Sequence, residues 1–400
     1  MILGQRIRLN PNNVQATFFE RCAGTARKVF NDGLARWQEL RETGGKPNWR
    51  ALNGELNAHK AADFPWMSEL PWAVPNNALR DLGNAFSHFF RRVKAGDAKV
   101  GYPRFKSKKR DAPSFAIEAR ALQLDGKRIK IPKLGWVRTR QELRFPGKVL
   151  SARFTKRAGH WYLSIQVEIA DSWVYPHRCE TQAVVGVDLG VVDLAVLSTG
   201  EKIEAPRVLR THDKRLRRFG KELARRTKGG ANWSKTKGKL GRLHERIANV
   251  RKDVTHKLTA RIVRDFRTIG VENLNVKGMA ANGRLAKSVM DAAMSEVLRQ
   301  LDYKAELAGS VVMKADRWYP SSKTCSACGV IRESLPLGVR QWTCESCGTE
   351  HDRDDNAAQN LKIVAAAHAA TAQCQGSSGR EKSSVKLPFG WESSGCVNLG

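Results

Sequence analysis

The sequence predicts an α+β protein of several domains: a helical domain, a small antiparallel β-barrel, and a mixed-sheet domain that carries an inserted zinc ribbon. Three observations lead to this prediction. The hydrophobic pattern changes along the 400 residues from helical spacing to alternation and then to continuous apolar runs. Two Cys-x-x-Cys pairs stand fifteen residues apart near the C-terminal end. Lys and Arg number 70 against 39 Asp and Glu, a formal net charge of +31.

The positive charge indicates a polyanionic partner, most simply a nucleic acid. A role at a membrane surface is the alternative, but the sequence has no long apolar run and no basic amphipathic anchor at its ends. The first residues also lack the apolar core of a signal peptide. We therefore expect no membrane partner, and paired cysteines that hold zinc are typical of a reducing cytoplasm.

Residues 1–12 read as a short strand, which we assign to the barrel as its first strand. Residues 13–99 are predicted to form the helical domain. Apolar residues recur at helical spacing in 13–44 and again in 76–94, where basic residues take the opposite face.

Residues 100–180 are predicted to form the rest of the barrel. Turn residues separate four short strand patterns, at 129–131, 135–138, 150–154 and 161–167. Before them, a run from Tyr102 interleaves aromatic and basic side chains, including Arg104 and Lys106. Such a run can stack on bases and neutralise phosphates, and a solvated charged loop is the open alternative.

The mixed-sheet domain is predicted over residues 181–318. A near-continuous apolar run at 183–187 is typical of a buried central strand, and it ends in Asp188. A second apolar run at 194–197 completes a hairpin. Another short strand at 268–271 ends in Glu272. A single helix over 286–308 and a strand over 311–314 are predicted to follow.

Inside this domain, residues 205–266 are predicted to form a long basic helical hairpin that bends at Gly229-Gly230. Residues 206–252 hold seventeen Lys or Arg and only three Asp or Glu. A solvated helix face ordinarily carries both signs, so this imbalance favours a nucleic-acid contact.

The zinc ribbon is predicted over residues 319–350. Each Cys-x-x-Cys pair is followed by a glycine, Gly329 or Gly348, where a tight knuckle needs a backbone with positive φ. Two knuckles close a tetrahedron around one zinc ion and leave no open position for chemistry. The four predicted ligands are Cys325, Cys328, Cys344 and Cys347.

An alanine-rich helix over 351–368 is predicted to close the mixed-sheet domain, and a disordered tail to occupy 369–400. The helix opens with Asp352, Asp354 and Asp355. Acidic residues there can cap the helix or coordinate a hard cation.

Three carboxylates thus stand at equivalent places. Asp188 and Glu272 end strands, and Asp354 opens a helix. If the strands form one sheet, the three side chains converge, and their repulsion calls for divalent cations. A pair of Mg²⁺ ions held this way supports phosphodiester hydrolysis. The order of these elements is that of the ribonuclease H-like nucleases.

Four motifs closely resemble those of the TnpB (OrfB-type) proteins of bacterial insertion sequences. They are GVDLG at 186–190, VENLNVKGM at 271–279, WYPSSKTC at 318–325 and DRDDNAA at 352–358. The resemblance extends to YPRFKS at 102–107 and LHERI at 243–247, and it covers the chain to about residue 365. One departure is Asn273, where relatives often carry Asp.

The resemblance implies an RNA-guided DNA endonuclease, related to type V CRISPR effectors, with one RuvC-like site. It implies a wedge barrel, a helical recognition domain at 13–99 and a target-nucleic-acid-binding ribbon. By motif position the catalytic, magnesium-binding acids are Asp188, Glu272 and Asp354, although Asp352 and Asp355 stay open as alternatives to Asp354. We expect a monomeric ribonucleoprotein in the bacterial cytoplasm, near the nucleoid, acting on double-stranded DNA.

A guided enzyme of this kind must read a short flanking motif directly. Asn76, Asn77 and Arg80 have the chemistry to contact base edges, and ordinary exposed helix residues are the alternative. Three other functions remain open. A silent RNA-guided regulator is expected to have lost the acids, whereas an unguided transposase would use the same acids on the ends of its element. A plain zinc-ribbon nucleic-acid-binding protein is the third, and metal-dependent cleavage would exclude it.

Overall fold

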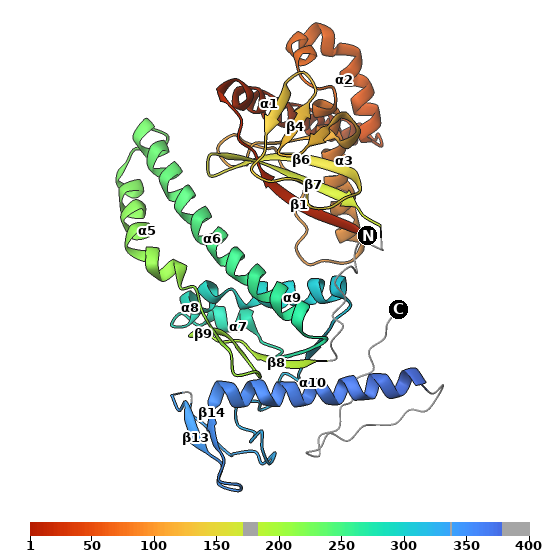
Figure 1. Ribbon diagram of the computed structural model, residues 1–400. Helices are drawn as coiled ribbons and strands as arrows, with labels where there is room; N and C mark the ends of the chain where they lie inside the picture. Colours follow the sequence, from red (N-terminus) through yellow and green to blue (C-terminus); the bar gives the residue numbers. More distant parts are fainter. Residues whose placement is uncertain (171–182, 337, 378–400) are drawn as a thin grey trace. The chain divides into compact units, whose positions relative to one another are not determined.

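The computed structural model (Figure 1) describes residues 1–170, 183–336 and 338–377. The chain divides into two compact units, Met1–Trp173 and Val174–Gly400. Within the described residues, no helix combines the length and apolar character needed to cross a bilayer.

The first unit contains a four-stranded antiparallel sheet. Its order is β1 (Ile2–Arg8), β7 (His160–Glu168), β6 (Lys148–Arg157) and β2 (Ser114–Glu118). β1 pairs with β7 along its whole length. The first strand therefore joins strands that come after the helical segment, as the sequence analysis expected.

Two long helices pack on each other and on this sheet: α1 (Asn13–Glu42) and α3 (Ala73–Lys94). Asn12 and Gln15 form a reciprocal capping box at the start of α1. Phe19 on α1 lies 5.2 Å from the ring of Trp161 and 5.5 Å from that of Phe154. This aromatic cluster joins helix to sheet in the core of the unit.

The first unit also holds elements that the sequence analysis did not predict. These are α2 (Trp49–Asp63), the short 3₁₀ helix η1 (Pro65–Glu69) and the strands β2 and β3 (Gln123–Asp125). β3 pairs with β4 (Arg128–Ile131), which pairs with β5 (Gly135–Arg138). An isolated bridge between Leu9 and Thr139 joins this small sheet to the end of β1. A closed barrel stays a prediction.

The second unit is built on the predicted mixed sheet. Its order is β10 (Lys202–Glu204), β9 (Asp193–Leu197), β8 (Val184–Asp188), β11 (Thr268–Val271) and β12 (Val311–Lys314). β8, β11 and β12 are parallel, and β9 is antiparallel to β8. Every residue of β11 is buried, which explains its unbroken apolar sequence.

The predicted basic hairpin is present as α5 (Val208–Arg225) and α6 (Ala231–Asp265). The two helices lie side by side (Figure 1) and share a small apolar seam of Phe219, Leu243 and Ile247. The turn contains Gly229, whose φ is +93°, so the predicted bend is confirmed.

The prediction of one helix over 286–308 is wrong. The structure has α8 (Ala286–Ala292) and α9 (Met294–Ala308), preceded by the short α7 (Val276–Ala281). Ala293 separates α8 from α9 with a φ of +56°, a left-handed conformation that cannot continue a right-handed helix.

The last helix, α10 (Arg353–Ser377), runs past the predicted end at residue 368. The prediction of disorder is therefore wrong for residues 369–377, where the chain continues to offer alanines and other helix-compatible residues. The rest of the predicted tail, 378–400, lies outside the described residues. Before α10, the ribbon contributes a small hairpin of β13 (Gln341–Thr343) and β14 (Glu350–Asp352).

Candidate functional site

Two glycines let α10 lie unusually close to the mixed sheet. Gly186 on β8 and Gly270 on β11 are direct register partners. A Cβ atom on Gly186 would lie 1.9 Å from the carbonyl oxygen of Ala358, and one on Gly270 would lie 2.3 Å from that of Leu361. Any side chain at these two positions would push the helix away. The glycine pair therefore places α10 against β8 and β11.

The first two acids lie two residues beyond these glycines. Asp188 is the last residue of β8, and Glu272 follows β11 directly. Since Val187 and Val271 are register partners on parallel strands, Asp188 and Glu272 come next to each other at one edge of the sheet. Side chains two residues apart share a face, so both acids point to the α10 side.

The third acid comes from the first turn of α10. Asp354 precedes Ala358 by four residues, about one helical turn toward the helix start. The structure thus brings Asp354 toward the sheet edge that carries Asp188. Asp352 serves another purpose, because its carboxylate accepts the backbone N–H groups of Asp354 at 3.0 Å and Asp355 at 3.1 Å. It therefore caps α10.

Lys202 on β10 engages the two alternative acids. Its ammonium lies 3.0 Å from the carboxylate of Asp352 and 3.1 Å from that of Asp355. Asp354 has no such link to Lys202. The charge of Asp354 helps to raise the pKa of Asp188.

The electrostatics of Asp188 show how close the carboxylates come. Burial raises the pKa of Asp188, the charges of Glu272 and Asp354 raise it further, and the result is a pKa of about 8. Three carboxylates that neighbour one another in a partly dry site repel unless protons or cations neutralise them. The donor set is all oxygen, which Mg²⁺ prefers.

Neighbouring side chains hold the other two acids in place. The Ser321 hydroxyl donates a hydrogen bond of 2.5 Å to the carboxylate of Glu272. Arg340 from the ribbon donates to both carboxylate oxygens of Asp354, at 3.0 and 2.9 Å. The guanidinium partly neutralises the charge of Asp354.

Two buried asparagines on α10 anchor the segment that carries Ser321. Asn360, which is fully buried, donates to the carbonyl oxygens of Ser321 at 2.7 Å and Thr324 at 2.6 Å. Asn356 donates to Thr324 at 2.7 Å and accepts the backbone N–H of Ser326 at 2.9 Å. Residues 321–326 join the acid site to the first cysteine knuckle, so this asparagine clamp couples the two.

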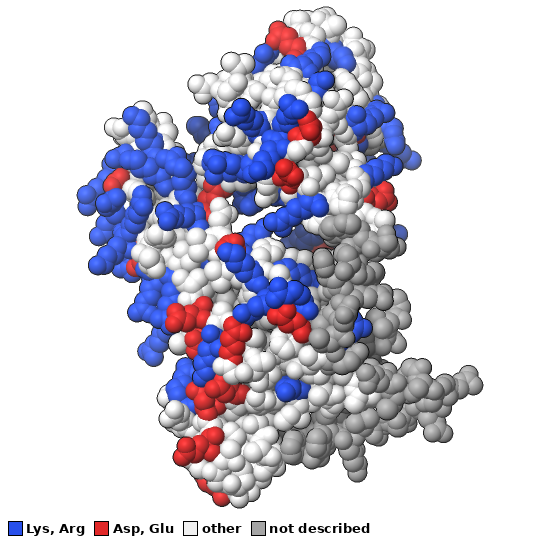
Figure 2. Space-filling view, viewed as in Figure 1, with Lys and Arg blue, Asp and Glu red and all other residues white. Residues whose placement is uncertain are grey.

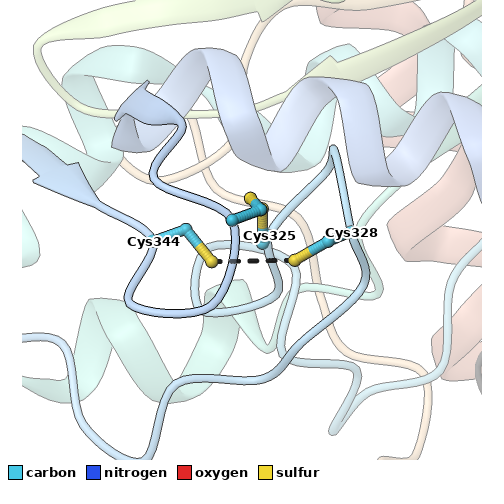
Figure 3. Close-up of side chains that lie close together, drawn as sticks. Cys325, Cys328 and Cys344 are labelled. Atoms are coloured by element: carbon cyan, nitrogen blue, oxygen red, sulfur yellow. Dashed lines mark hydrogen bonds between the residues drawn. The ribbon is translucent and has the colours of Figure 1, made fainter.

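The four predicted zinc ligands converge, and Figure 3 labels three of them, Cys325, Cys328 and Cys344. Their sulfur atoms all lie within 4.8 Å of one another, and the Cys325–Cys347 and Cys328–Cys344 pairs are each separated by 3.6 Å. Four thiolates around one zinc ion are expected about 3.8 Å apart, given a Zn–S bond of about 2.3 Å. The residues therefore fit a tetrahedral structural zinc.

The knuckle glycines adopt the predicted backbone. Gly329 has a φ of +79° and Gly348 a φ of +72°. Each donates its N–H to the carbonyl oxygen of the first cysteine of its pair, at 2.8 and 2.9 Å. His351 lies behind the cluster, with Nε2 3.0 Å from the sulfur of Cys325 and its ring 4.7 Å from that of Trp342.

In the described part of the chain, the cysteines are the one group of three or more metal-ligating side chains whose donor atoms all lie within 4.8 Å. The three acids are more widely spread.

The α5–α6 hairpin presents the predicted basic surface. Figure 2 shows Lys and Arg gathered over this hairpin with few acidic side chains among them. Arg217, Arg218 and Lys257 are mostly exposed, although each has an acidic partner one turn away. The unbalanced positive charge is available to a phosphate backbone.

The predicted base-reading residues of the first unit differ in exposure. Asn77 is buried at 2% exposure and donates to the carbonyl oxygen of Ala116 at 3.2 Å, so that prediction is wrong for Asn77 in this structure. The Asn77 side chain is buried because it lies on the face of α3 that packs against the sheet. Asn76 is half-buried, and Arg80 lies 3.3 Å from the carboxylate of Glu118.

The basic-aromatic run is partly engaged within the first unit. Tyr102 is 47% exposed and contacts Phe86 edge-on, and Arg104 is exposed. The ammonium of Lys106 lies 3.6 Å from the ring centre of Phe30, and burial lowers its pKa. Lys106 therefore serves the packing of this unit, whereas Tyr102 and Arg104 remain accessible.

Sequence reasoning missed the residues that position the acids: Gly186, Gly270, Ser321, Asn356 and Asn360. Their roles depend on contacts between segments far apart in the chain. The signal that could have found the asparagines is their four-residue spacing in an alanine-rich helix, which places two amides on one face.

Three family models match the chain. One described as a probable transposase matches residues 164–283, a Cas12f1-like TNB domain matches 295–361, and a helix-turn-helix domain matches 1–46. Among curated proteins, the chain is 36% identical to one from Streptomyces pristinaespiralis, over 95% of this chain and 94% of that one. It is 32% identical to InsQ of Escherichia coli K12, over 92% of each.

Both relatives are provisionally named as RNA-guided DNA endonucleases. The endodeoxyribonuclease Cas12f1 of Sulfoacidibacillus thermotolerans is 28% identical over 52% of this chain and 51% of its own length. A solved structure of Cas12j bound to crRNA aligns with 91% of this chain and 98% of its own, with 10% identity and a TM-score of 0.41.

Proposed function

Because this chain belongs to the TnpB (OrfB-type) family, we propose that it is an RNA-guided DNA endonuclease. A bound guide RNA pairs with one strand of the target DNA, and the acid site then hydrolyses phosphodiester bonds. Base pairing reads the sequence, while the protein holds the RNA–DNA heteroduplex through its shape and backbone. The curated relatives named for this activity match nearly the whole chain, which supports the assignment.

One observation carries the proposal: the glycine-seated α10 brings Asp354 to the sheet edge where Asp188 and Glu272 end their strands. We assign these three acids as catalytic residues that would hold two Mg²⁺ ions. Bound there, such ions stabilise the attacking and leaving oxygens of phosphodiester hydrolysis. Ser321 orients the carboxylate of Glu272, and Arg340 holds the carboxylate of Asp354.

The remaining parts receive supporting roles. The ribbon holds a structural zinc through Cys325, Cys328, Cys344 and Cys347, and the α5–α6 hairpin contacts the phosphate backbone of RNA or DNA. The first unit would supply the wedge and recognition parts. Asn76 and Arg80 are the proposed readers of the flanking motif, and Tyr102 and Arg104 the proposed backbone and base contacts there.

The experiment is to express the chain together with the DNA that flanks its gene, purify it, and sequence the RNA that copurifies. A discrete RNA whose 3′ segment comes from beyond the element is the expected result, and that segment names the DNA to test for cutting. Heterogeneous cellular RNA would contradict guidance. Strand-transfer products formed without RNA would instead favour the unguided transposase.

A further inference from the structure

A cavity of about 340 Å³ opens in the second unit. One wall is Val191 and Val192, in the loop that follows Asp188. The opposite wall is α8, with Asp291 and Ala292. Its volume lies within the range of small-ligand pockets. Nothing described above occupies it or assigns it a role.

Three arginines give this cavity an unbalanced positive charge. Arg207, Arg210 and Arg284 line it, and none of their guanidinium groups pairs with a carboxylate anywhere in residues 1–170, 183–336 and 338–377. The fourth basic side chain, Lys287, is already balanced, because its ammonium lies 2.9 Å from the carboxylate of Asp213.

The one carboxylate in the wall does not cancel this charge. Asp291 is 5% exposed, and its oxygens accept the backbone N–H groups of Leu209 at 2.9 and 3.0 Å and of Arg210 at 3.2 Å. Its negative charge is therefore already stabilised by the N–H groups of the first turn of α5. Arg207 donates to the carbonyl oxygen of Val192 at 3.4 Å, so the guanidinium donors of Arg210 and Arg284 are the ones that remain available for an anion.

The cavity is also apolar in part, which a simple anion site does not need. Val191, Val192, Ala205 and Ala292 line it together with the arginines, and Val192 is 47% exposed. An arginine pair beside an apolar wall suits a nucleotide, whose phosphate takes the guanidinium donors while its sugar and base cover the valines.

The position points to the strand that is cut. Val191 follows Asp188 by three residues, so their Cα atoms are at most about 11 Å apart. We propose that this cavity binds one nucleotide of the DNA strand next to the bond presented to Asp188, Glu272 and Asp354. Arg210 and Arg284 hold its phosphate, and Val191 and Val192 contact its sugar and base. The proposal rests on the proposed function for its substrate strand.

The first test needs no guide RNA or cutting. The full zinc-loaded chain is titrated calorimetrically with the 5′-phosphorylated dinucleotide pdTpdT and, separately, with inorganic phosphate. The variant Arg210→Gln/Arg284→Gln should bind the dinucleotide at least about tenfold more weakly than the native chain. The matched control is Arg299→Gln/Lys314→Gln, which removes the same charge from exposed positions of α9 and β12, outside both the cavity and the α5–α6 hairpin.

Each other outcome decides against the proposal. Equal losses in the two double variants would mean general charge attraction. Inorganic phosphate binding as tightly as the dinucleotide, with Val192→Ala unchanged for both, would mean an anion site without a nucleotide wall.

The second test uses the guided complex. A target strand carries one neutral methylphosphonate at each position within a few nucleotides of the cut. In the native complex one such position should slow cutting about tenfold or more, and in Arg210→Gln/Arg284→Gln the same position should have little further effect. If the double variant loses guide RNA instead, the cavity belongs to RNA and the proposal is wrong.

The two tests separate this proposal from the proposed function. If dinucleotide binding depends on Arg210 and Arg284 but no guided cutting is found, the nucleotide-binding cavity is supported and the endonuclease function is contradicted. If guided cutting is found but the double variant behaves as the native chain in both assays, the endonuclease function is supported and the nucleotide-binding cavity is contradicted.

Discussion

At the scale of single residues, Asp188 is set apart by its surroundings, because burial and the charges of Glu272 and Asp354 raise its pKa to about 8 and so favour the protonated carboxyl group at neutral pH. A cation would reverse that state by favouring the carboxylate. The crowding of these three acids should therefore lower the stability of the folded protein where no cation neutralises them.

We predict that this cost appears as a pH dependence of stability. The pKa of Asp188 is about 8 in the folded chain and about 3.9 in an unfolded chain, so between these values the folded state binds the extra proton. The free energy of unfolding should then fall as pH rises from about 4 to about 8, by at most about 1.4 kcal/mol per pH unit. Urea unfolding of the zinc-loaded, magnesium-free chain measures it.

Asp188→Asn removes the titrating group and should flatten this slope, whereas Asp253→Asn, at an exposed position on α6, should not. Added Mg²⁺ should restore stability at pH 8 in the native chain. A native slope equal to that of Asp188→Asn would show that the three acids do not interact as described.

The asparagine clamp yields a second prediction at this scale. Asn360→Ala leaves the carbonyl oxygens of Ser321 and Thr324 without that donor in a fully buried place. The free energy of unfolding should fall by about 2–4 kcal/mol. Lys362→Ala, two residues along the same helix and exposed, should change it by less than about 0.5 kcal/mol. Equal effects in denaturant titrations would mean that the clamp contributes nothing.

Among whole elements, α10 and the ribbon organise the second unit. α10 covers the mixed sheet where Gly186 and Gly270 lie side by side, and its first turn delivers Asp354 to the sheet edge. The asparagine clamp fastens the start of the ribbon to the same helix. Displacement of α10 therefore moves both an acid and the segment that orients Glu272.

We predict that Gly186→Ala displaces α10. The new methyl group would meet the carbonyl oxygen of Ala358 at 1.9 Å, so the chain should lose about 3 kcal/mol or more of unfolding free energy. Gly220→Ala is the matched control, since Gly220 is exposed on α5 with nothing near its Cβ position, and it should gain up to about 1 kcal/mol. Chemical denaturation compares the two, and a Gly186→Ala chain as stable as the native one would contradict the close seat of α10.

Zinc removal should loosen the ribbon and its neighbours together. We expect one zinc per chain by elemental analysis, and loss of that zinc in Cys344→Ser. A strong chelator should make the stretch from 321 to 352 sensitive to protease, because the metal replaces a large core there. Cys22→Ala should keep its zinc, since Cys22 lies buried in α1 and burial raises the pKa of its thiol to about 12. Full protease resistance after zinc loss would contradict a structural metal.

For the whole molecule, the sequence predicted those elements whose structure depends on residues close together in the chain. The cysteine spacing located the ribbon, the apolar runs located β8, β9, β11 and β12, and the acids at their ends followed. The basic hairpin and its glycine bend could also be predicted, because helical spacing and turn residues are signals that span only a few positions.

Features that depend on contacts between segments far apart in the sequence could not be predicted. The turn at Ala293 has no sequence signal, since alanine ordinarily favours a continuous helix. Asn77 was predicted to lie at the surface, but the packing of α3 on the sheet buries its side chain. The glycine pair and the asparagine clamp join strands, helix and ribbon across long separations, so only tertiary structure reveals them.

The most direct test of the account is to measure cutting of a DNA matched to the copurified guide, by the native complex and by Asp188→Asn. We predict that the native complex cuts only when Mg²⁺ is present. Asp188→Asn should bind the same RNA and the same DNA with affinities within about twofold and cut at least about a thousandfold more slowly. Equal cutting by both proteins, or loss of RNA binding together with cutting, would contradict the assignment of these three acids as the catalytic site.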